Sequence, residues 1–145
     1  IGRYTFHKET NMKCLSTILI FIILLIGGCK SGKSRYALER ANRLAVGHKI
    51  FIATSVPFDE EMKDRIHRHR RERGSDWKTV EAPDRLAGAI QSNSGDDRVV
   101  LVDCLTLWIN NLLMENQDSE QILNQFQSLT RAVSSATCPA ILVSN

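Results

Sequence analysis

Runs of apolar residues alternate along this chain with segments of helical periodicity. The apolar runs predict strands covered on both faces of a sheet, and they lie at 18–26, 49–55, 98–103 and 140–143. A shorter extended segment is predicted at 77–82. The unbroken run at 18–26 has the pattern of a buried central strand.

The segments between these strands carry apolar residues three or four positions apart, as amphipathic helices do. Helices are predicted at 36–45, from Asp59 to a stop at Gly74, from Pro83 to about Ile90, at 105–114 and at 119–135. In the second helix, Phe58, Met62 and Ile66 form one apolar stripe. A polar loop is predicted at 92–97. Strands that alternate with helices predict right-handed crossovers, and therefore a three-layer α/β sandwich with a mostly parallel sheet.

Composition restricts the classes of protein that fit this pattern. The chain has 145 residues, enough for one domain, with 43% hydrophobic and 24% charged residues, as in soluble globular proteins. A net charge of +3 is too small to indicate nucleic-acid binding. The four cysteines are far apart and form no metal-type pair, which favours reduced thiols in the cytoplasm; they are Cys14, Cys29, Cys104 and Cys138.

The segment between the first strand and the first helix fits G-x-x-x-x-G-K-[ST], the phosphate-binding P-loop. It reads Gly27, Gly28, Cys29, Lys30, Ser31, Gly32, Lys33 and Ser34. Glycines let main-chain N–H groups surround phosphate oxygens, and the following helix directs its positive end at them. Lys33 would bridge the β- and γ-phosphates, and the Ser34 hydroxyl would bind Mg²⁺. The alternative is an ordinary turn between a strand and a helix.

The same region also has the features of a bacterial lipoprotein signal. A basic start after Met12 precedes an apolar run and small residues before Cys29, which would carry the lipid. The run is too short for a transmembrane helix. We favour the strand, because the downstream sequence continues to supply parts of a nucleotide site, and we expect no stable membrane insertion.

Asp103 ends the apolar strand at 98–103. Ligands of open α/β sheets bind at the carboxyl ends of the strands. In a P-loop protein this carboxylate would hold Mg²⁺, whereas the alternative role is to cap the following helix. The second strand ends in the small polar residues Thr54 and Ser55. A further candidate is Glu81, which could accept hydrogen bonds from a ribose or base; the alternative is a surface glutamate without a role in binding.

The second helix carries a basic segment from Arg65 to Arg73. Its simplest interpretation is a solvated helix face, and the alternative is a contact patch for phosphate or nucleic acid. Aromatic residues are not interleaved in this segment, which argues against binding of single-stranded nucleic acid. His67 and His69 are two positions apart and therefore point to different sides, which argues against a shared metal. His69 flanks the apolar stripe, and a neutral imidazole there could attack phosphorus while arginines stabilise phosphoryl charge. Spacing alone leaves this role for His69 open.

Together these motifs resemble one known family over residues 20–145, the bifunctional adenosylcobinamide kinase/adenosylcobinamide-phosphate guanylyltransferases. The shared segments are Gly-Gly-x-x-Ser-Gly-Lys-Ser, Ile-Ala-Thr-Ser, Asp-Glu-Glu-Met, Arg-Ile-x-x-His, Trp-x-Thr-x-Glu and Asp-Cys-Leu-Thr, in that order. The resemblance implies a fold of the P-loop NTPase (RecA-like) type. It also implies two reactions in cobalamin nucleotide-loop assembly: phosphorylation of adenosylcobinamide, and transfer of GMP from GTP to the product.

The resemblance further implies roles for single residues. His69 falls on the guanylylated histidine, and 27–34 on the triphosphate loop, with Lys33 catalytic. Ala53, Thr54, Ser55, Glu81 and Asp103 fall on positions near the nucleotide, as do four residues after the histidine, which are Arg70, Arg71, Glu72 and Arg73. GTP and ATP are the implied nucleotide substrates, Mg²⁺ the implied cofactor, and a homotrimer with sites near subunit boundaries the implied assembly.

The chain departs from the family pattern at three places. Lys30 replaces an arginine, which keeps the charge and loses the planar fork. The long apolar segment before the loop is atypical of the family, and residues 1–17 are expected to be a non-native or disordered extension before a domain at 18–145. The family continues beyond Asn145, so we expect the C-terminal part of the domain to be missing. The alternative functions are another P-loop small-molecule kinase, or a lipid-anchored binding protein.

Overall fold

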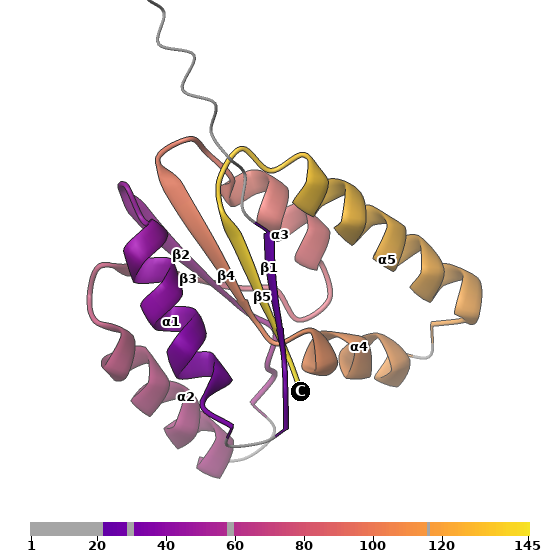
Figure 1. Cartoon of the computed structure of the whole chain (residues 1–145). Helices are drawn as coiled ribbons and strands as arrows, with labels where there is room; N and C mark the ends of the chain where they lie inside the picture. The colour runs from indigo at the N-terminus through magenta and orange to yellow at the C-terminus, as the bar shows by residue number, and fades with distance from the viewer. Residues whose placement is uncertain (1–21, 29–30, 58–59, 116) are drawn as a thin grey trace, which may run out of the picture.

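A parallel sheet forms the middle layer of the protein (Figure 1). The computed structural model describes residues 22–28, 31–57, 60–115 and 117–145, and the Arg65 side chain is not among the described atoms. Within these residues the sheet has five strands in the order β1-β5-β4-β2-β3. They are β1 (Ile22–Ile26), β2 (His48–Ala53), β3 (Trp77–Glu81), β4 (Arg98–Asp103) and β5 (Ala140–Ser144). Each neighbouring pair is parallel, which confirms the predicted α/β class.

Helices cover both faces of this sheet (Figure 1). On one side lie α1 (Lys33–Leu44) and α2 (Glu60–Arg73), and on the other lie α3 (Leu86–Asn93), α4 (Leu105–Met114) and α5 (Ser119–Ser134). No helix in the described ranges is long and apolar enough to cross a membrane. The predicted bounds of β4 and α4 are confirmed to the residue.

Successive side chains of the central strands point to opposite faces of the sheet, and this divides the core into two parts. Val99 and Leu101 pack with Ala37 and Ala41 of α1, whereas Val100 and Val102 pack with α3, α4 and α5. This division is the reason why β4 reads as a continuous apolar run, since side chains on both of its faces are buried. The arrangement fixes the carboxyl ends of β2, β4 and β5 side by side.

The prediction that residues 18–26 form a buried central strand is wrong for the part that is described. β1 pairs only with β5 and lies at the edge of the described sheet. Only one face of β1 is packed: Ile23 and Leu25 contact the core cluster that contains Ala37 and Ala41 of α1, while Ile22, Leu24 and Ile26 are exposed. The start of this run, the proposed extension at 1–17, and Cys29 and Lys30 lie outside the described residues.

Two predictions about helices also need correction. α3 begins at Leu86 rather than at Pro83, and it continues to Asn93, into the segment predicted as a loop. In α2, the described members of the predicted stripe, Met62 and Ile66, line a cavity and are only partly buried. Phe58, the third member, is outside the described residues. The predicted stop of α2 at Gly74 is confirmed, since α2 ends at Arg73 and Gly74 has a φ of +93°, a conformation typical of a residue that ends a helix.

The turn before β2 gives a test of this packing. A Cβ atom at Gly47 would lie 2.7 Å from the main-chain oxygen of Asp97, whereas a Cβ at Gly88 in α3 would meet no atom within 4 Å. We expect Gly47→Ala to lower the free energy of unfolding by about 1–3 kcal/mol through this overlap. Gly88→Ala should raise it by about 0.5–1 kcal/mol through helix propensity. Urea denaturation of both variants measures the difference, and equal midpoints would contradict the close approach at Gly47.

Candidate active site

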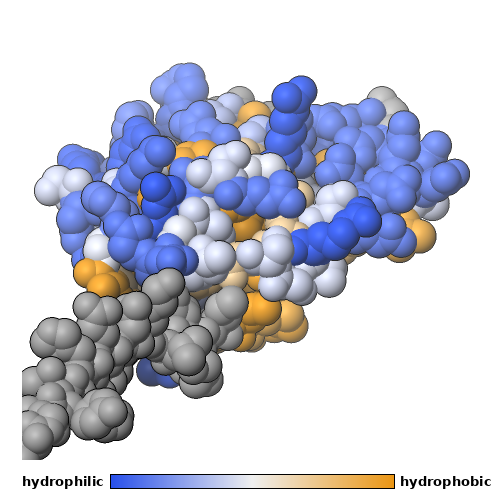
Figure 2. All heavy atoms as spheres, turned by 90° about the horizontal axis from the view of Figure 1, so that it is seen from above, coloured by the Kyte–Doolittle hydropathy of each residue, from blue (hydrophilic) through white to orange (hydrophobic). Residues whose placement is uncertain are grey.

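A cavity of about 1140 Å³ opens at the carboxyl end of the sheet, between α2 and the beginning of α1. A smaller cavity of about 400 Å³ adjoins it and reaches Leu38 and Leu101 below α1. The opposite, amino end of the strands has a mainly hydrophilic surface (Figure 2). Because the larger cavity lies at the carboxyl ends of the strands, it has the position at which parallel α/β sheets bind their ligands.

The P-loop segment forms one wall of the larger cavity. Ser31, Gly32, Lys33 and Ser34 line it. Gly32 is the N-cap of α1 and has a φ of +82°, a conformation that favours glycine. The Lys33 ammonium donates a hydrogen bond of 2.9 Å to the main-chain oxygen of Gly28, so the lysine closes back over the loop. The N-terminus of α1 thus presents its main-chain N–H groups and an ammonium to one space.

Gly27 and Gly28 shape this loop without lining the cavity. A Cβ at Gly27 would lie 3.2 Å from the Ser31 hydroxyl oxygen, which is a tight approach. The main-chain oxygen of Gly28 accepts both the Lys33 ammonium and the Ser31 N–H. A side chain would therefore be crowded at Gly27, whereas a Cβ at Gly28 would meet no atom within 4 Å.

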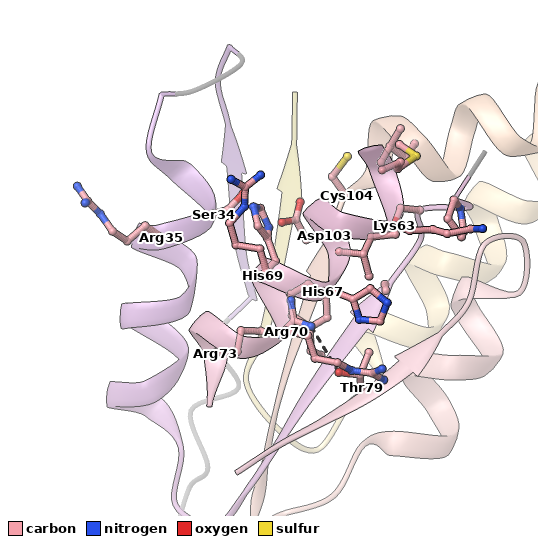
Figure 3. Close-up of a pocket in the computed structure, with 18 of the residues that line it drawn as sticks. Ser34, Arg35, Lys63, His67, His69, Arg70, Arg73, Thr79, Asp103 and Cys104 are labelled. Carbon is pink, nitrogen blue, oxygen red and sulfur yellow. Dashed lines mark hydrogen bonds between the residues drawn. The ribbon is translucent and has the colours of Figure 1, made fainter. Parts of the chain in front are cut away.

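His69 lies on α2 and is half-buried over the cavity. It lines both cavities, and so do Ser34 of α1 and Asp103 at the end of β4. Figure 3 shows His69 close to Ser34 and Asp103. His67 lines the larger cavity only, is exposed, and points away from this group (Figure 3). The structure thus brings His69, and not His67, to the P-loop.

Arg73 attaches the end of α2 to the sheet. Its guanidinium carbon lies 3.5 Å from the centre of the Phe51 ring, and Nη2 donates to the Thr79 hydroxyl at 3.5 Å. Burial, followed by the positive charge of Arg70, lowers the pKa of Arg73; the side chain nevertheless keeps its charge at neutral pH. A cation over an aromatic face stabilises this attachment. Arg73 thereby links the end of α2 to β2 and β3.

The other residues after His69 are distributed differently around the site. Arg70 lines the larger cavity, and Glu72 lines the smaller one. Arg71 is exposed and lines neither cavity. Successive residues of a helix point about 100° apart, which is why a run of four adjacent residues cannot all face one ligand.

Residues at the carboxyl ends of β2 and β3, or just after them, complete the wall. Ala53, Ser55 and Glu81 line the larger cavity. Thr54 does not, because its side chain is fully buried and its hydroxyl is bonded to the backbone of Cys104. Cys104 lies beneath Asp103, and burial raises the pKa of its thiol. A protonated thiol there adds no charge to the site.

Ser34 and Asp103 fit a magnesium ion that is shared with a nucleotide. A hydroxyl and a carboxylate are hard oxygen donors, which Mg²⁺ prefers. Within the described residues there is no group of three or more His, Cys, Asp or Glu side chains that could hold a metal by themselves. Two protein oxygens that leave positions for phosphates and water are typical of magnesium–nucleotide sites.

Several residues of the cavity were not predicted from the sequence. Asn145 follows β5, the strand that lies between β1 and β4 in the sheet. Its main-chain N–H donates to the Thr106 hydroxyl at 3.0 Å. The rule that indicated Asp103, a polar residue at the carboxyl end of a strand, applies equally to Asn145. Other lining residues carried no local signal, and they include Phe51, Pro57, Glu61, Lys63, Arg68, Thr79 and Leu107.

Comparison with known proteins gives concordant matches. Residues 23–145 match the family model described as cobinamide kinase / cobinamide phosphate guanyltransferase. The chain is 40% identical over 124 residues to the bifunctional adenosylcobalamin biosynthesis protein CobP of Pseudomonas aeruginosa, which covers 84% of this chain and 69% of that protein. It is 34% identical over 139 residues to the bifunctional adenosylcobalamin biosynthesis protein CobU of Escherichia coli K12, covering 86% of this chain and 74% of the relative. The CobU of Salmonella typhimurium is 32% identical over a segment of the same length.

Proposed function

The chain belongs to the cobinamide kinase / cobinamide phosphate guanyltransferase family, and from this premise we propose that it carries out both reactions in the cavity between α1 and α2. In the first, adenosylcobinamide is phosphorylated by a nucleoside triphosphate. In the second, GMP passes from GTP to the adenosylcobinamide phosphate through His69. The observation that supports this most is that Ser34, His69 and Asp103 line the same two cavities.

In the kinase step, the main-chain N–H groups at 31–34 hold the β- and γ-phosphates, and Lys33 stabilises the charge that develops between them. To do so, the Lys33 ammonium leaves the main-chain oxygen of Gly28. The hydroxyl oxygen of the cobinamide arm attacks the γ-phosphorus, the bond to the β-phosphate oxygen breaks, and the hydroxyl proton is released. The products are a phosphate ester and a nucleoside diphosphate.

In the transfer step, the imidazole of His69 attacks the α-phosphorus of GTP, and pyrophosphate leaves. The phosphoramidate on His69 is then attacked by a phosphate oxygen of adenosylcobinamide phosphate. The P–N bond breaks, GDP-cobinamide forms, and the imidazole is regenerated. A covalent intermediate divides one difficult displacement into two easier ones. Arg70 and Lys33, which line the same cavity as His69, supply positive charge to the phosphoryl oxygens.

Ser34 and Asp103 are the residues that we propose to hold the Mg²⁺ of the bound nucleotide, since both line the cavity and both offer oxygen. When bound, the ion would neutralise part of the negative charge of the phosphates. Glu81 and Ser55 lie on the same wall and are proposed to contact the ribose or base.

Labelling with GTP tests the proposal directly. Incubation with GTP labelled in the α-phosphate is expected to leave an acid-labile, base-stable label on the protein, because a phosphoramidate is hydrolysed in acid. Peptide mapping is expected to assign the label to His69. A P-loop kinase for another small molecule would bind the nucleotide and remain unlabelled. A label on a residue other than His69 would contradict the proposed intermediate.

We also propose a homo-oligomer, a trimer as in the family, that works in the cytoplasm. Large apolar side chains exposed on β1, α4 and α5 support an interface, and they are Ile22, Leu24, Ile26, Leu113, Met114 and Leu123. Sedimentation equilibrium measures the assembly; a concentration-independent monomer mass would contradict it.

A further inference from the structure

A buried hydroxyl is hydrogen-bonded to the residue that follows the carboxylate proposed above to bind metal. Thr54 follows β2 and has no exposed surface. Its Oγ1 donates to the main-chain oxygen of Cys104 at 2.7 Å and accepts the main-chain N–H of Cys104 at 2.9 Å. One side chain thus satisfies both polar main-chain groups of a residue that is 50 positions away.

Cys104 is the corner between β4 and α4. It follows Asp103 and is the N-cap of α4, and its own side chain makes no capping hydrogen bond. The main-chain N–H of Thr54 also donates to the oxygen of Asp103 at 3.4 Å. Asp103 pairs with Ala53 in the sheet. The main chain at Asp103 and at Cys104 is therefore held by Ala53 and Thr54.

Asn111 connects this corner to a third segment. Its side-chain amide is buried and donates to the main-chain oxygens of Thr54 at 2.8 Å and Pro83 at 3.0 Å. The ends of β2 and β4, the loop after β3 and helix α4 are thus joined by hydrogen bonds shielded from water. Buried networks whose members are all paired fix one geometry, because any displaced member loses partners that water cannot replace.

We propose that Thr54 is a positioning residue for Asp103: its hydroxyl fixes the β4–α4 corner so that the carboxylate points at the metal of the bound nucleotide. The inference rests on the proposed function, in which Asp103 holds Mg²⁺. Thr54 itself touches neither cavity. Residues that orient a metal ligand in this way commonly affect metal affinity on the order of tenfold or more when they are replaced.

The test is the affinity of the full chain for Mn²⁺ in the presence of a β,γ-imido nucleoside triphosphate, measured by electron paramagnetic resonance. Thr54→Val keeps the shape and removes the hydroxyl, so we expect Mn²⁺ affinity to fall on the order of tenfold. Thr54→Ser keeps the hydroxyl, and its affinity is expected within about twofold of the parent. Affinity for the nucleotide without metal is expected to be unchanged, because the P-loop remains intact.

Trp108→Phe is the matched control. Its indole N–H donates to the main-chain oxygen of Asp84 at 3.0 Å, so this variant also removes a buried hydrogen bond of α4, but one that does not hold Cys104. If Thr54→Val and Trp108→Phe lower the melting temperature while both retain parental Mn²⁺ affinity, Thr54 has only a structural role and the inference is overturned. If Thr54→Val is insoluble, Thr54→Cys, which offers a weaker donor, replaces it under the same criterion.

Asp103→Asn separates this inference from its premise. Loss of Mn²⁺ affinity in Asp103→Asn, together with no loss in Thr54→Val, overturns the positioning role alone. If Asp103→Asn retains parental Mn²⁺ affinity, Asp103 does not hold the metal, and the positioning role of Thr54 is overturned together with it.

Discussion

Replacement of His69 by alanine is expected to abolish transfer of GMP while phosphorylation of adenosylcobinamide continues. The variant lacks the imidazole nitrogen that would attack the α-phosphorus in the cavities that His69 shares with Ser34 and Asp103. Removal of a covalent nucleophile typically costs about a thousandfold or more in kcat. In the proposed mechanism the kinase step uses the P-loop and Asp103 and not His69, so its rate should stay within about threefold. Separate assays of GDP-cobinamide and cobinamide phosphate measure the two effects.

His67→Ala is the control for this variant, because His67 lies on the same helix and lines the larger cavity, but is exposed and directed away from the P-loop. It should retain the protein-bound label and most of the transferase activity. A fully labelled His69→Ala variant would contradict the assignment of His69 as the nucleophile. Equal losses in His67→Ala and His69→Ala would indicate instead that the charge of α2, rather than one imidazole, matters.

The second large effect is expected for Lys33→Ala, which should impair both reactions. Lys33 is the only side chain of the loop at 31–34 that carries a positive charge, and charge on the transferring phosphoryl group must be neutralised in each step. Loss of one such preorganised charge costs about a hundredfold to a thousandfold in kcat. The loss of the Lys33 hydrogen bond to Gly28 affects only an exposed contact, so the fold should persist. Steady-state kinetics of each reaction, with circular dichroism as a check of folding, measure this effect.

Arg43→Ala gives the matched control, since Arg43 is an exposed cation in the last turn of the same helix and lines neither cavity. Its kinetics should equal those of the parent protein. A Lys33→Ala variant with parental kcat in both assays would contradict a common phosphate site for the two reactions.

Much of the architecture follows from local sequence. The apolar run at Arg98–Asp103 and the helical periodicity at Leu105–Met114 gave the bounds of β4 and α4, because strand and helix patterns depend on neighbours two to four residues away. The P-loop pattern likewise indicated the loop before α1, and the strand-end rule indicated Asp103. Family resemblance then singled out His69, whose role spacing alone had left open.

Other features depend on residues that are distant in the sequence. The apolar pattern of residues 18–26 does not reveal that β1 pairs on one side only, since strand order is set by which crossovers pack together. The position of Arg73 over Phe51 depends on how α2 meets β2, and no spacing predicts it.

Thr54 shows the division most directly. The sequence by itself placed it at the end of a strand beside a phosphate site, and determined the parallel α/β fold, the P-loop and the acidic strand end. Only the tertiary structure decided that the Thr54 side chain turns inward to Cys104 and that β1 lies at the edge of the sheet formed by the described residues. It also decided that His69 faces the loop while His67 does not. The physical reason is that secondary structure follows from local periodicity, whereas the direction of a side chain at a strand end is selected by hydrogen-bond partners that folding brings from far along the chain.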